Sequence, residues 1–162
     1  MNHCAPGRFV RRGSLSEGSG DVEAAAPCSF LDEGNRRMRQ NIAGSSPYEP
    51  IIGFSRAVRV GNTVHVSGTG PVGADEADAA TQTRHTLEII RAALEKAGAR
   101  MEDVVRTRMY LTRVEDWEAV GRAHGEFFGA VRPAATMVVV AKLLNPSWRI
   151  EIEVDAVVEQ QD

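Results

Sequence analysis

From about residue 46 onward, apolar side chains recur with the periods of strands and helices. Residues 57–60 and 63–67 alternate, and the Gly61-Asn62 pair between them predicts a hairpin closed by a type II′ turn. Apolar residues at helical spacing predict two amphipathic helices, over residues 79–97 and 116–128, with Gly98 ending the first. The expected inward stripes are Leu87, Ile90, Leu94 and Ala97 on the first helix and Trp117, Val120, His124 and Phe128 on the second.

Three further strands are predicted, over residues 104–112, 132–140 and 149–158. The last alternates strictly, with Ile150, Ile152, Val154, Ala156 and Val158 on one face and Glu151, Glu153 and Asp155 on the other. In residues 104–112 the expected faces are Arg106, Arg108 and Tyr110 on one side and Val105, Met109 and Leu111 mostly on the other. The order β-β-α-β-α-β-β predicts an α+β fold of two layers, in which one mixed sheet packs on two helices.

The helices of such a domain cover one face of the sheet only. The other face carries the Val and Ala side chains of residues 138–141 together with charged residues, and it must meet solvent or another subunit. A sheet of this size with an uncovered face favours a homo-oligomer.

Residues 1–44 differ from the rest of the chain. They are rich in Gly, Ser, Ala and Arg and show no apolar period, which predicts a disordered or weakly ordered N-terminal extension before a single domain over residues 45–160. Met38 would make a natural start just before the patterned region. We therefore interpret the extension as an upstream addition, with a regulatory arm as the alternative.

Composition narrows the classes of function. An isoelectric point near 5.8 argues against a nucleic-acid partner, and no stretch has the roughly 18 consecutive apolar residues of a membrane span. Cys4 and Cys28 are the only cysteines, so the patterned region needs no disulfide and suits a reducing cytoplasm. His65, His85 and His124 lack the close spacing of a metal site, and His124 is expected to be a hydrogen-bonded core residue. We expect no metal and no cofactor.

Several short motifs occur in a familiar order: IGFSRAV at 52–58, VHVSG at 64–68, FF at 127–128, RPA at 132–134 and IEIE at 150–153. Together they resemble the Rid family (reactive intermediate deaminases, also called the YjgF-type or endoribonuclease L-PSP family) over about residues 52–158. The resemblance implies a chorismate-mutase-like fold and a homotrimer, with a central barrel of packed sheets and pockets at the subunit interfaces.

The resemblance also implies an activity, the hydrolysis of enamines and imines such as 2-aminoacrylate to a keto acid and ammonia. In that chemistry an arginine just after the Pro-Ala pair binds the substrate carboxylate through two parallel hydrogen bonds. This chain has Ala135 there, and Phe54 replaces a tyrosine of the deaminating members. Met137 stands where a cysteine is common, and Thr69 where a glutamine is common. The chain is thus a divergent member without the catalytic arginine.

Two candidate catalytic residues remain. Glu151 matches a family glutamate thought to hold or activate water, and Ser67, with Gly68 after it, offers a hydroxyl and a backbone N–H. The alternative for Glu151 is a cross-strand ion pair with Arg106 or Arg108. Glu153 and Asp155 are expected to be structural.

The remaining candidates are substrate-binding residues. Arg56, Arg108 and Arg132 are candidates to replace the missing arginine. Arg132 precedes Pro133, so its backbone is expected to be extended and its side chain could point away from the site. Tyr48 could fold over the pocket or belong to a packed surface turn. The full substrate-binding set is Phe54, Ser55, Arg56, Gly68, Thr69, Arg132, Ala135, Met137 and Tyr48.

These residues favour a cytoplasmic trimer that hydrolyses or protonates a small carbonyl- or imine-bearing metabolite other than 2-aminoacrylate. The alternative is a non-catalytic trimer that binds a small ligand or has a regulatory role. Ribonuclease activity, which one family name implies, fits poorly with an acidic chain that lacks a basic aromatic surface.

Overall fold

The computed structural model describes residues 39–159. Most of the predicted N-terminal extension, with Cys4 and Cys28, lies outside the described residues. The elements are, in order, β1 (Arg39–Ile42), η1 (Glu49–Gly53), β2 (Ala57–Val60), β3 (Thr63–Thr69), α1 (Ala79–Lys96), η2 (Met101–Asp103), β4 (Val104–Leu111), η3 (Val114–Asp116), α2 (Trp117–Phe128), β5 (Ala134–Val139) and β6 (Ile150–Val157).

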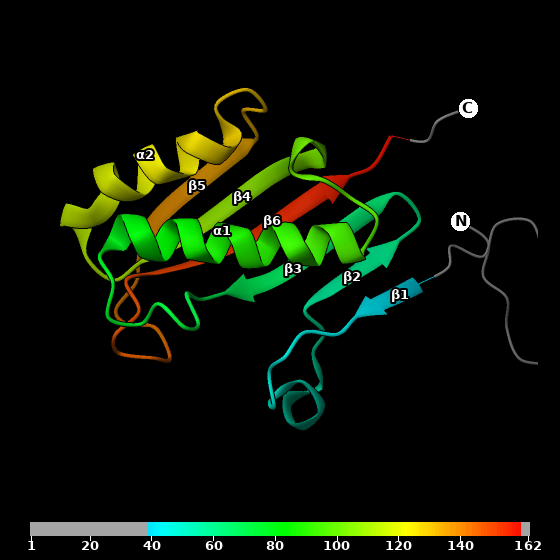
Figure 1. Cartoon of the computed structure of the whole chain (residues 1–162), viewed down its shortest axis with the longest axis horizontal. Helices are drawn as coiled ribbons and strands as arrows, with labels where there is room; N and C mark the ends of the chain where they lie inside the picture. The colour runs from blue at the N-terminus through cyan, green and yellow to red at the C-terminus, as the bar shows by residue number, and fades with distance from the viewer. Residues whose placement is uncertain (1–38, 160–162) are drawn as a thin grey trace, which may run out of the picture. The chain divides into compact units, whose positions relative to one another are not determined.

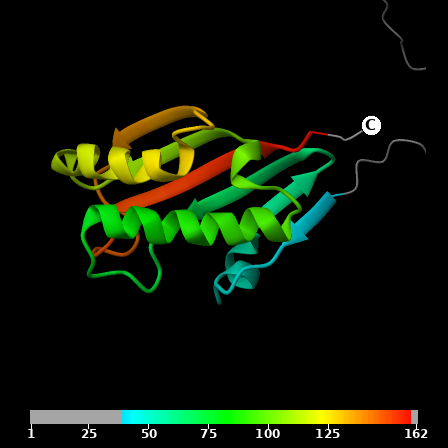
Figure 2. The same ribbon diagram turned by 45° about the horizontal axis from the view of Figure 1, so that its top comes forward.

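The strands form one mixed sheet in the order β1-β2-β3-β6-β4-β5. Neighbouring strands are antiparallel, except that β4 and β5 are parallel. Helices α1 and α2 lie side by side on one face of the sheet (Figures 1 and 2). The predicted two-layer α+β architecture is confirmed. We call the sheet face that points away from both helices the outer face.

The sheet begins earlier than predicted. Arg39, Gln40 and Asn41 are exposed and show no apolar period, which is why they fall in the predicted extension. In the structure they form β1 with Ile42, which is buried opposite Ala57 on β2. β1 thus lies within the predicted N-terminal extension, because an edge strand can be fixed by backbone pairing and one buried side chain.

The core lies between the helices and the inner face of the sheet. The predicted stripes of α1 and β6 are confirmed as buried: Leu87, Ile90, Leu94 and Ala97 on the helix, and Ile150, Ile152, Val154 and Ala156 on the strand. On α2 the buried stripe is Val120, Ala123 and Phe128. Trp117, predicted to face inward, is the first residue of α2 and stays 59% exposed.

A register shift in β4 changes which of its side chains face the helices. Pairing with β6 is irregular between Val104 and Arg106, so Val105 turns outward and is 48% exposed, against prediction. The next inward position is taken by Thr107, which is fully buried and hydrogen-bonded to the His124 ring at 3.1 Å. His124 is thus the satisfied core histidine that was predicted, and burial lowers its pKa.

The hairpin and the end of α1 are tied together by Arg59. Gly61 has a φ of +62°, which suits the first position of the predicted type II′ turn, and Gly98 ends α1 with a φ of +71°. The Arg59 guanidinium donates to the carbonyl oxygens of Gly61 at 2.9 Å, Ala97 at 2.7 Å and Gly98 at 3.0 Å. Arg59 thereby satisfies the carbonyls of the two residues that follow α1, whereas those of Ala93, Leu94 and Glu95 in its last turn accept from backbone N–H groups.

Two loops at the opposite end of the sheet are joined by polar contacts. Trp148 donates its indole N–H to Asp75 at 2.7 Å, and the same carboxylate accepts from Asn145 at 2.7 Å. The buried Gln82 side chain donates to the carbonyl oxygens of Asp75 and Ser147. The Trp148 ring also packs directly on Gly70, just after β3, where a β-carbon would lie 2.3 Å from the ring.

Candidate functional site

The candidate catalytic residues meet at a bulge in β3. Val66 pairs with Val154 and Thr69 with Ile152, so three steps along β3 span two steps along β6. The extra residue lies at Ser67-Gly68. Bulges of this kind bend a strand and redirect side chains, and they are common beside functional sites. We use the name bulge site for Arg56, Ser67, Gly68, Thr69 and Glu151.

Glu151 lies directly against Gly68. A β-carbon built on Gly68 would come within 2.2 Å of Glu151 Oε1, so only glycine permits the observed position of this carboxyl group. The side chain is half-buried, and burial raises its pKa, opposed by Arg56 and assisted by Glu153. Glu151 therefore retains its proton to a higher pH than an exposed glutamate and is suited to proton transfer.

The predicted alternative for Glu151, an ion pair with Arg106 or Arg108, is not what the structure shows. Glu151 stands opposite Tyr110 on β4. Arg108 bonds instead to Glu153 at 2.9 Å and to Asp155 at 3.2 Å. Among residues 39–159, Glu151 has no ion-pair partner within 4 Å.

Ser67 uses its hydroxyl hydrogen to hold the bulge. Its Oγ donates to the carbonyl oxygen of Ser55 at 2.7 Å, and its backbone N–H donates to Arg56 at 3.0 Å. The Ser55 hydroxyl in turn accepts from Asn41 on β1 at 2.8 Å. Ser67 can accept a hydrogen bond from a ligand or water, but its own hydrogen is committed to the backbone.

Arg56, the residue just before β2, spans the bulge. Its Nη1 donates to Thr69 Oγ1 at 2.6 Å and to the carbonyl oxygens of Gly68 at 3.2 Å and Ser67 at 3.4 Å. Thr69 is 3% exposed and donates to the Ser67 carbonyl at 2.7 Å, so its hydroxyl is a support and not a ligand contact. Burial lowers the pKa of Arg56, and the charges of Glu49 and Glu151 act against that effect.

Ala135 and Met137 do not join the bulge site within one chain. They pair with Thr107 and Met109, which face the helices, and Met137 packs against the core. Glu151 lies on the outer face. The sheet therefore separates these two candidates from the Glu151 carboxyl group.

Arg132 is also remote from the bulge site. The strand that follows it begins opposite Arg106, four positions from Tyr110, which corresponds to about 13 Å along the sheet. The expectation of an extended backbone is wrong: Arg132 has a φ of +54°. Its N–H donates to the Phe128 carbonyl at 2.8 Å, so Arg132 closes the turn that follows α2, in a left-handed conformation. Its side chain is exposed and donates to Gly129.

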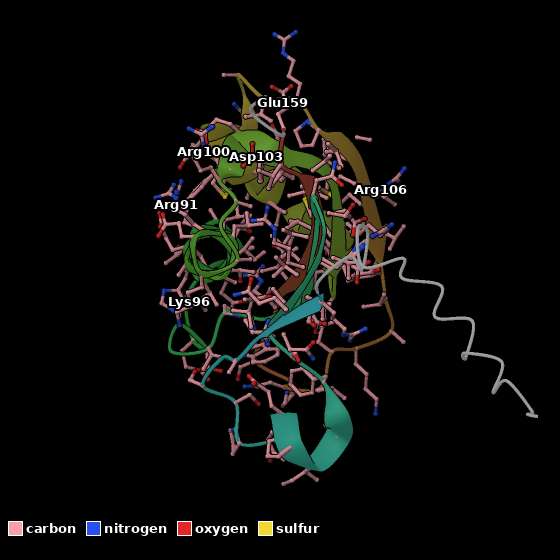
Figure 3. All side chains as sticks on the ribbon, turned by 90° about the vertical axis from the view of Figure 1, so that its right-hand side faces the viewer. Arg91, Lys96, Arg100, Asp103, Arg106 and Glu159 are labelled. Atoms are coloured by element: carbon pink, nitrogen blue, oxygen red, sulfur yellow. The ribbon has the colours of Figure 1, made fainter. Side chains whose placement is uncertain are left out.

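Tyr48 and Phe54 flank the single helical turn η1, which projects from the sheet (Figures 1 and 3). Tyr48 is 59% exposed, with Ile51 and Ile52 exposed beside it, so it does not fold over the bulge site of its own chain. Phe54 is half-buried, and its N–H donates to Glu49 at 3.2 Å.

A chain of polar contacts crosses the outer face. It was not predicted from the sequence. His65 bonds to Asp155 at 2.7 Å, Asp155 and Glu153 share Arg108, and the Tyr110 hydroxyl donates to Glu153 at 3.3 Å. Arg106 points to the same side of the sheet, away from α1 (Figure 3). The structural role predicted for Glu153 and Asp155 agrees with these contacts. The alternation of residues 106–110 in β4 and of residues 150–157 in β6 was the signal that could have revealed the Arg108, Tyr110, Glu153 and Asp155 contacts.

Residues 39–159 contain no group of three or more His, Cys, Asp or Glu side chains placed to hold a metal ion. Within the same residues, no helix has the length and apolar character needed to cross a bilayer.

The structure is that of a small α+β protein, and its bulge site contains one half-buried carboxyl group, that of Glu151. The chain belongs to the endoribonuclease L-PSP family, whose model matches residues 44–158. The resemblance drawn from the short motifs is thereby confirmed.

Known proteins of the same fold include a member of the YjgF/YER057c/UK114 family from Mycobacterium tuberculosis. Its crystal structure matches with a TM-score of 0.71 and 45% sequence identity, over 75% of this chain and 100% of that one. A 2-iminobutanoate/2-iminopropanoate deaminase of Dermatophagoides farinae is 36% identical over 68% of this chain and 90% of its own length. The 3-aminoacrylate deaminase RutC of Acinetobacter baylyi is 35% identical over 64% of this chain and 85% of its own.

Proposed function

We propose that this protein is an imine or enamine hydrolase of the Rid type, with Glu151 as the group that moves protons. The observation that carries the proposal is the state of this carboxyl group. It is half-buried, its pKa is raised, it has no ion-pair partner in the described chain, and it lies on a glycine that leaves it room. Relatives named as imine and aminoacrylate deaminases support the same class of reaction.

The proposed active unit is a homotrimer with one site at each subunit interface. The candidate residues fall into two groups on opposite faces of the sheet, so one site can use both groups only if two copies contribute. The exposed edge strand β5 supports association, because it presents Val138 and Val139, and Leu144 beyond it is 96% exposed.

The proposed reaction adds water across a C=N bond. The water oxygen bonds to the imine carbon while one water proton passes to Glu151, and Glu151 then protonates the nitrogen to give a carbinolamine. Glu151 next takes the hydroxyl proton and returns it to the nitrogen as the C–N bond breaks. The products are a carbonyl compound and ammonia, and Glu151 ends in its starting state.

The substrate is expected to differ from 2-aminoacrylate. Ala135 supplies no charge and Phe54 no hydroxyl, so the usual contacts to a small imino acid are missing. A second function, a non-catalytic ligand-binding trimer, is favoured by one observation, namely that the Ser67 hydroxyl hydrogen is engaged by Ser55.

The two functions are separated by assays on freshly generated imines of several amino acids. Wild-type protein, Glu151→Gln and the surface control Glu102→Gln would be compared at equal concentration. We expect release of ammonia by the wild type and by Glu102→Gln, and its loss in Glu151→Gln. Light scattering on the same samples should give the mass of a trimer. No turnover on any imine by the wild type would favour the ligand-binding function, and a monomer would overturn the two-copy site.

A further inference from the structure

Polar contacts between β4 and β6 on the outer face run diagonally. In the register of the two strands, Tyr110 stands opposite Glu151 and Arg108 stands opposite Glu153. The Tyr110 hydroxyl nevertheless donates to Glu153 at 3.3 Å, and Arg108 donates to Glu153 at 2.9 Å and to Asp155 at 3.2 Å. The Glu151 carboxyl group, at one end of the diagonal, therefore receives no hydrogen bond from the side chains of β4.

This diagonal fixes the position of the Glu153 carboxylate. Its Oε1 accepts from both Arg108 and Tyr110, so the group cannot turn without breaking two contacts. Burial, and then the charge of Glu153, raises the pKa of Tyr110, so the phenol stays neutral and keeps its donor hydrogen. β6 thus carries a negative charge at a defined place, two residues from Glu151.

Glu153 is the negative charge that acts most directly on Glu151 along the outer face. The charged or titratable side chains around Glu151 are Arg56 before β2, Glu49 on η1, His65 on β3, Tyr110 and Arg108 on β4, and Glu153 and Asp155 on β6. Alternate residues of a strand are about 7 Å apart, so Asp155, with its partner His65, is about 14 Å from Glu151. That separation exceeds the Debye length of about 8 Å at physiological salt.

Glu153 and Arg108 act on the Glu151 proton in opposite directions. A negative charge nearby favours retention of the proton, and a positive charge favours its loss. Burial is the main cause of the raised pKa of Glu151, Arg56 opposes it, and Glu153 adds to it. Arg108, which lies 2.9 Å from Glu153, offsets part of the Glu153 charge.

We infer that Glu153 and Arg108 are positioning residues for Glu151, and that this charge pair sets the pH range in which Glu151 transfers protons. The inference rests on the proposed function. Glu153 supplies a fixed negative charge, and Arg108 both holds Glu153 and offsets that charge. Tyr110 directs its hydroxyl to Glu153 and so leaves Glu151 free for water and substrate.

Glu153→Gln and Arg108→Gln test the charge pair, because they break the same ion pair but remove opposite charges. Without the Glu153 charge, Glu151 should lose its proton at a lower pH. Without Arg108, the full Glu153 charge acts on Glu151, which should keep its proton to a higher pH. Two charges about 7 Å apart near a protein surface imply a midpoint lower by about 0.5 in pH or more for Glu153→Gln, and a smaller rise for Arg108→Gln.

Two measurements report this midpoint. Carbon-13 NMR of protein labelled at the glutamate carboxyl groups follows the ionisation of Glu151 directly, and Glu151→Gln identifies its signal. The pH dependence of kcat/KM reports the same ionisation with any imine that the wild type hydrolyses. If the ion pair only held the two strands together, both variants would lose stability alike and the midpoint would not move in opposite directions.

Conservative and remote variants are the controls. Glu153→Asp and Arg108→Lys keep the charges, so their midpoints should stay near that of the wild type. Arg84→Gln and Glu126→Gln make the same charge changes in an ion pair that joins the two helices, and they should leave the midpoint unchanged. If one of the two test variants fails to fold, the other is compared with its own conservative variant. A midpoint that shifts in the same direction in both test variants, or in neither, would overturn the inference.

The outcomes separate this inference from the proposed function. Opposite midpoint shifts by NMR, without turnover of any imine, would support control of the Glu151 proton by the charge pair and refute the hydrolase. Turnover that requires Glu151, with one midpoint shared by the wild type, Glu153→Gln and Arg108→Gln, would refute the charge pair and leave the hydrolase standing.

Discussion

Replacing Gly70 by alanine tests the contact that fixes the loop before β6. Gly70 is buried and does not have a left-handed φ, so the backbone itself accepts alanine. The new methyl group, however, would lie 2.3, 2.4 and 2.6 Å from three carbon atoms of the Trp148 ring. The ring is rigid and cannot avoid the methyl group by rotating one bond.

The magnitude follows from how far the ring has to move. Ordinary carbon contacts begin near 3.5 Å, so Trp148 must retreat by about 1 Å. Its indole N–H is 2.7 Å from Asp75, and a shift of that size breaks the hydrogen bond. Overpacking of a buried position costs about 1 to 3 kcal/mol. We therefore expect the free energy of unfolding to fall by about 2 kcal/mol and the Tm by about 7 °C.

Gly68→Ala supplies the matched comparison. Its methyl group would lie even closer to a neighbour, 2.2 Å from Glu151 Oε1, but that atom ends a flexible side chain on the outer face. Glu151 can rotate away, so we expect a loss of stability under about 1 kcal/mol together with loss of the proposed activity. Gly121→Ala, whose methyl group meets open space, should raise stability by about 1 kcal/mol. Urea unfolding of all three variants is the assay. Equal destabilisation by Gly68→Ala and Gly70→Ala would refute the reasoning.

Three further outcomes are expected. Thr86→Val should raise the free energy of unfolding by about 1 kcal/mol, because the Thr86 hydroxyl is fully buried and has no hydrogen-bond partner in residues 39–159. Thermal unfolding would show a higher Tm, and a lower Tm would contradict the absence of a partner for this hydroxyl. Arg59→Met should lose about 2 kcal/mol, because three backbone carbonyls lose a charged donor, while Arg59→Lys should lose less in the same urea titration. Glu151→Gln should gain stability over the wild type as pH rises. The folded state holds the Glu151 proton above the ordinary pKa of 4.5, so the wild type is most stable below that pH and loses stability above it. A difference between the two proteins that stays constant from pH 4 to 8 would contradict the raised pKa.

The helices and most of the strands could be predicted because each buries one regular stripe. The Leu87–Ile90–Leu94 spacing of α1 and the alternation of β6 are complete in the sequence itself. β1 could not be found this way, since only Ile42 of its four residues is buried. An edge strand of this kind depends on backbone pairing with β2, which leaves no side-chain period.

The resemblance to the family located Glu151 and Ser67-Gly68, but it could not supply their geometry. The need for glycine at position 68 comes from Glu151, which is far away along the chain and adjacent only across the sheet. The left-handed φ of Arg132 likewise depends on how α2 ends, and the rule for residues before proline opposes it. The contacts of Arg56 depend on the bulge in β3, and no local sequence pattern predicts that bulge.

The place of β6 in the sheet has a consequence for synthesis of the protein. β6 is the last strand of the described chain to leave the ribosome, yet it lies in the middle of the sheet, between β3 and β4. Until it arrives, the nascent chain holds two separate ribbons, β1-β2-β3 and β4-β5, with no strand to join them. The apolar stripes of the helices therefore remain exposed until β6 has been synthesised. A chain truncated before residue 150 would keep this apolar surface exposed and become a substrate of chaperones and proteases.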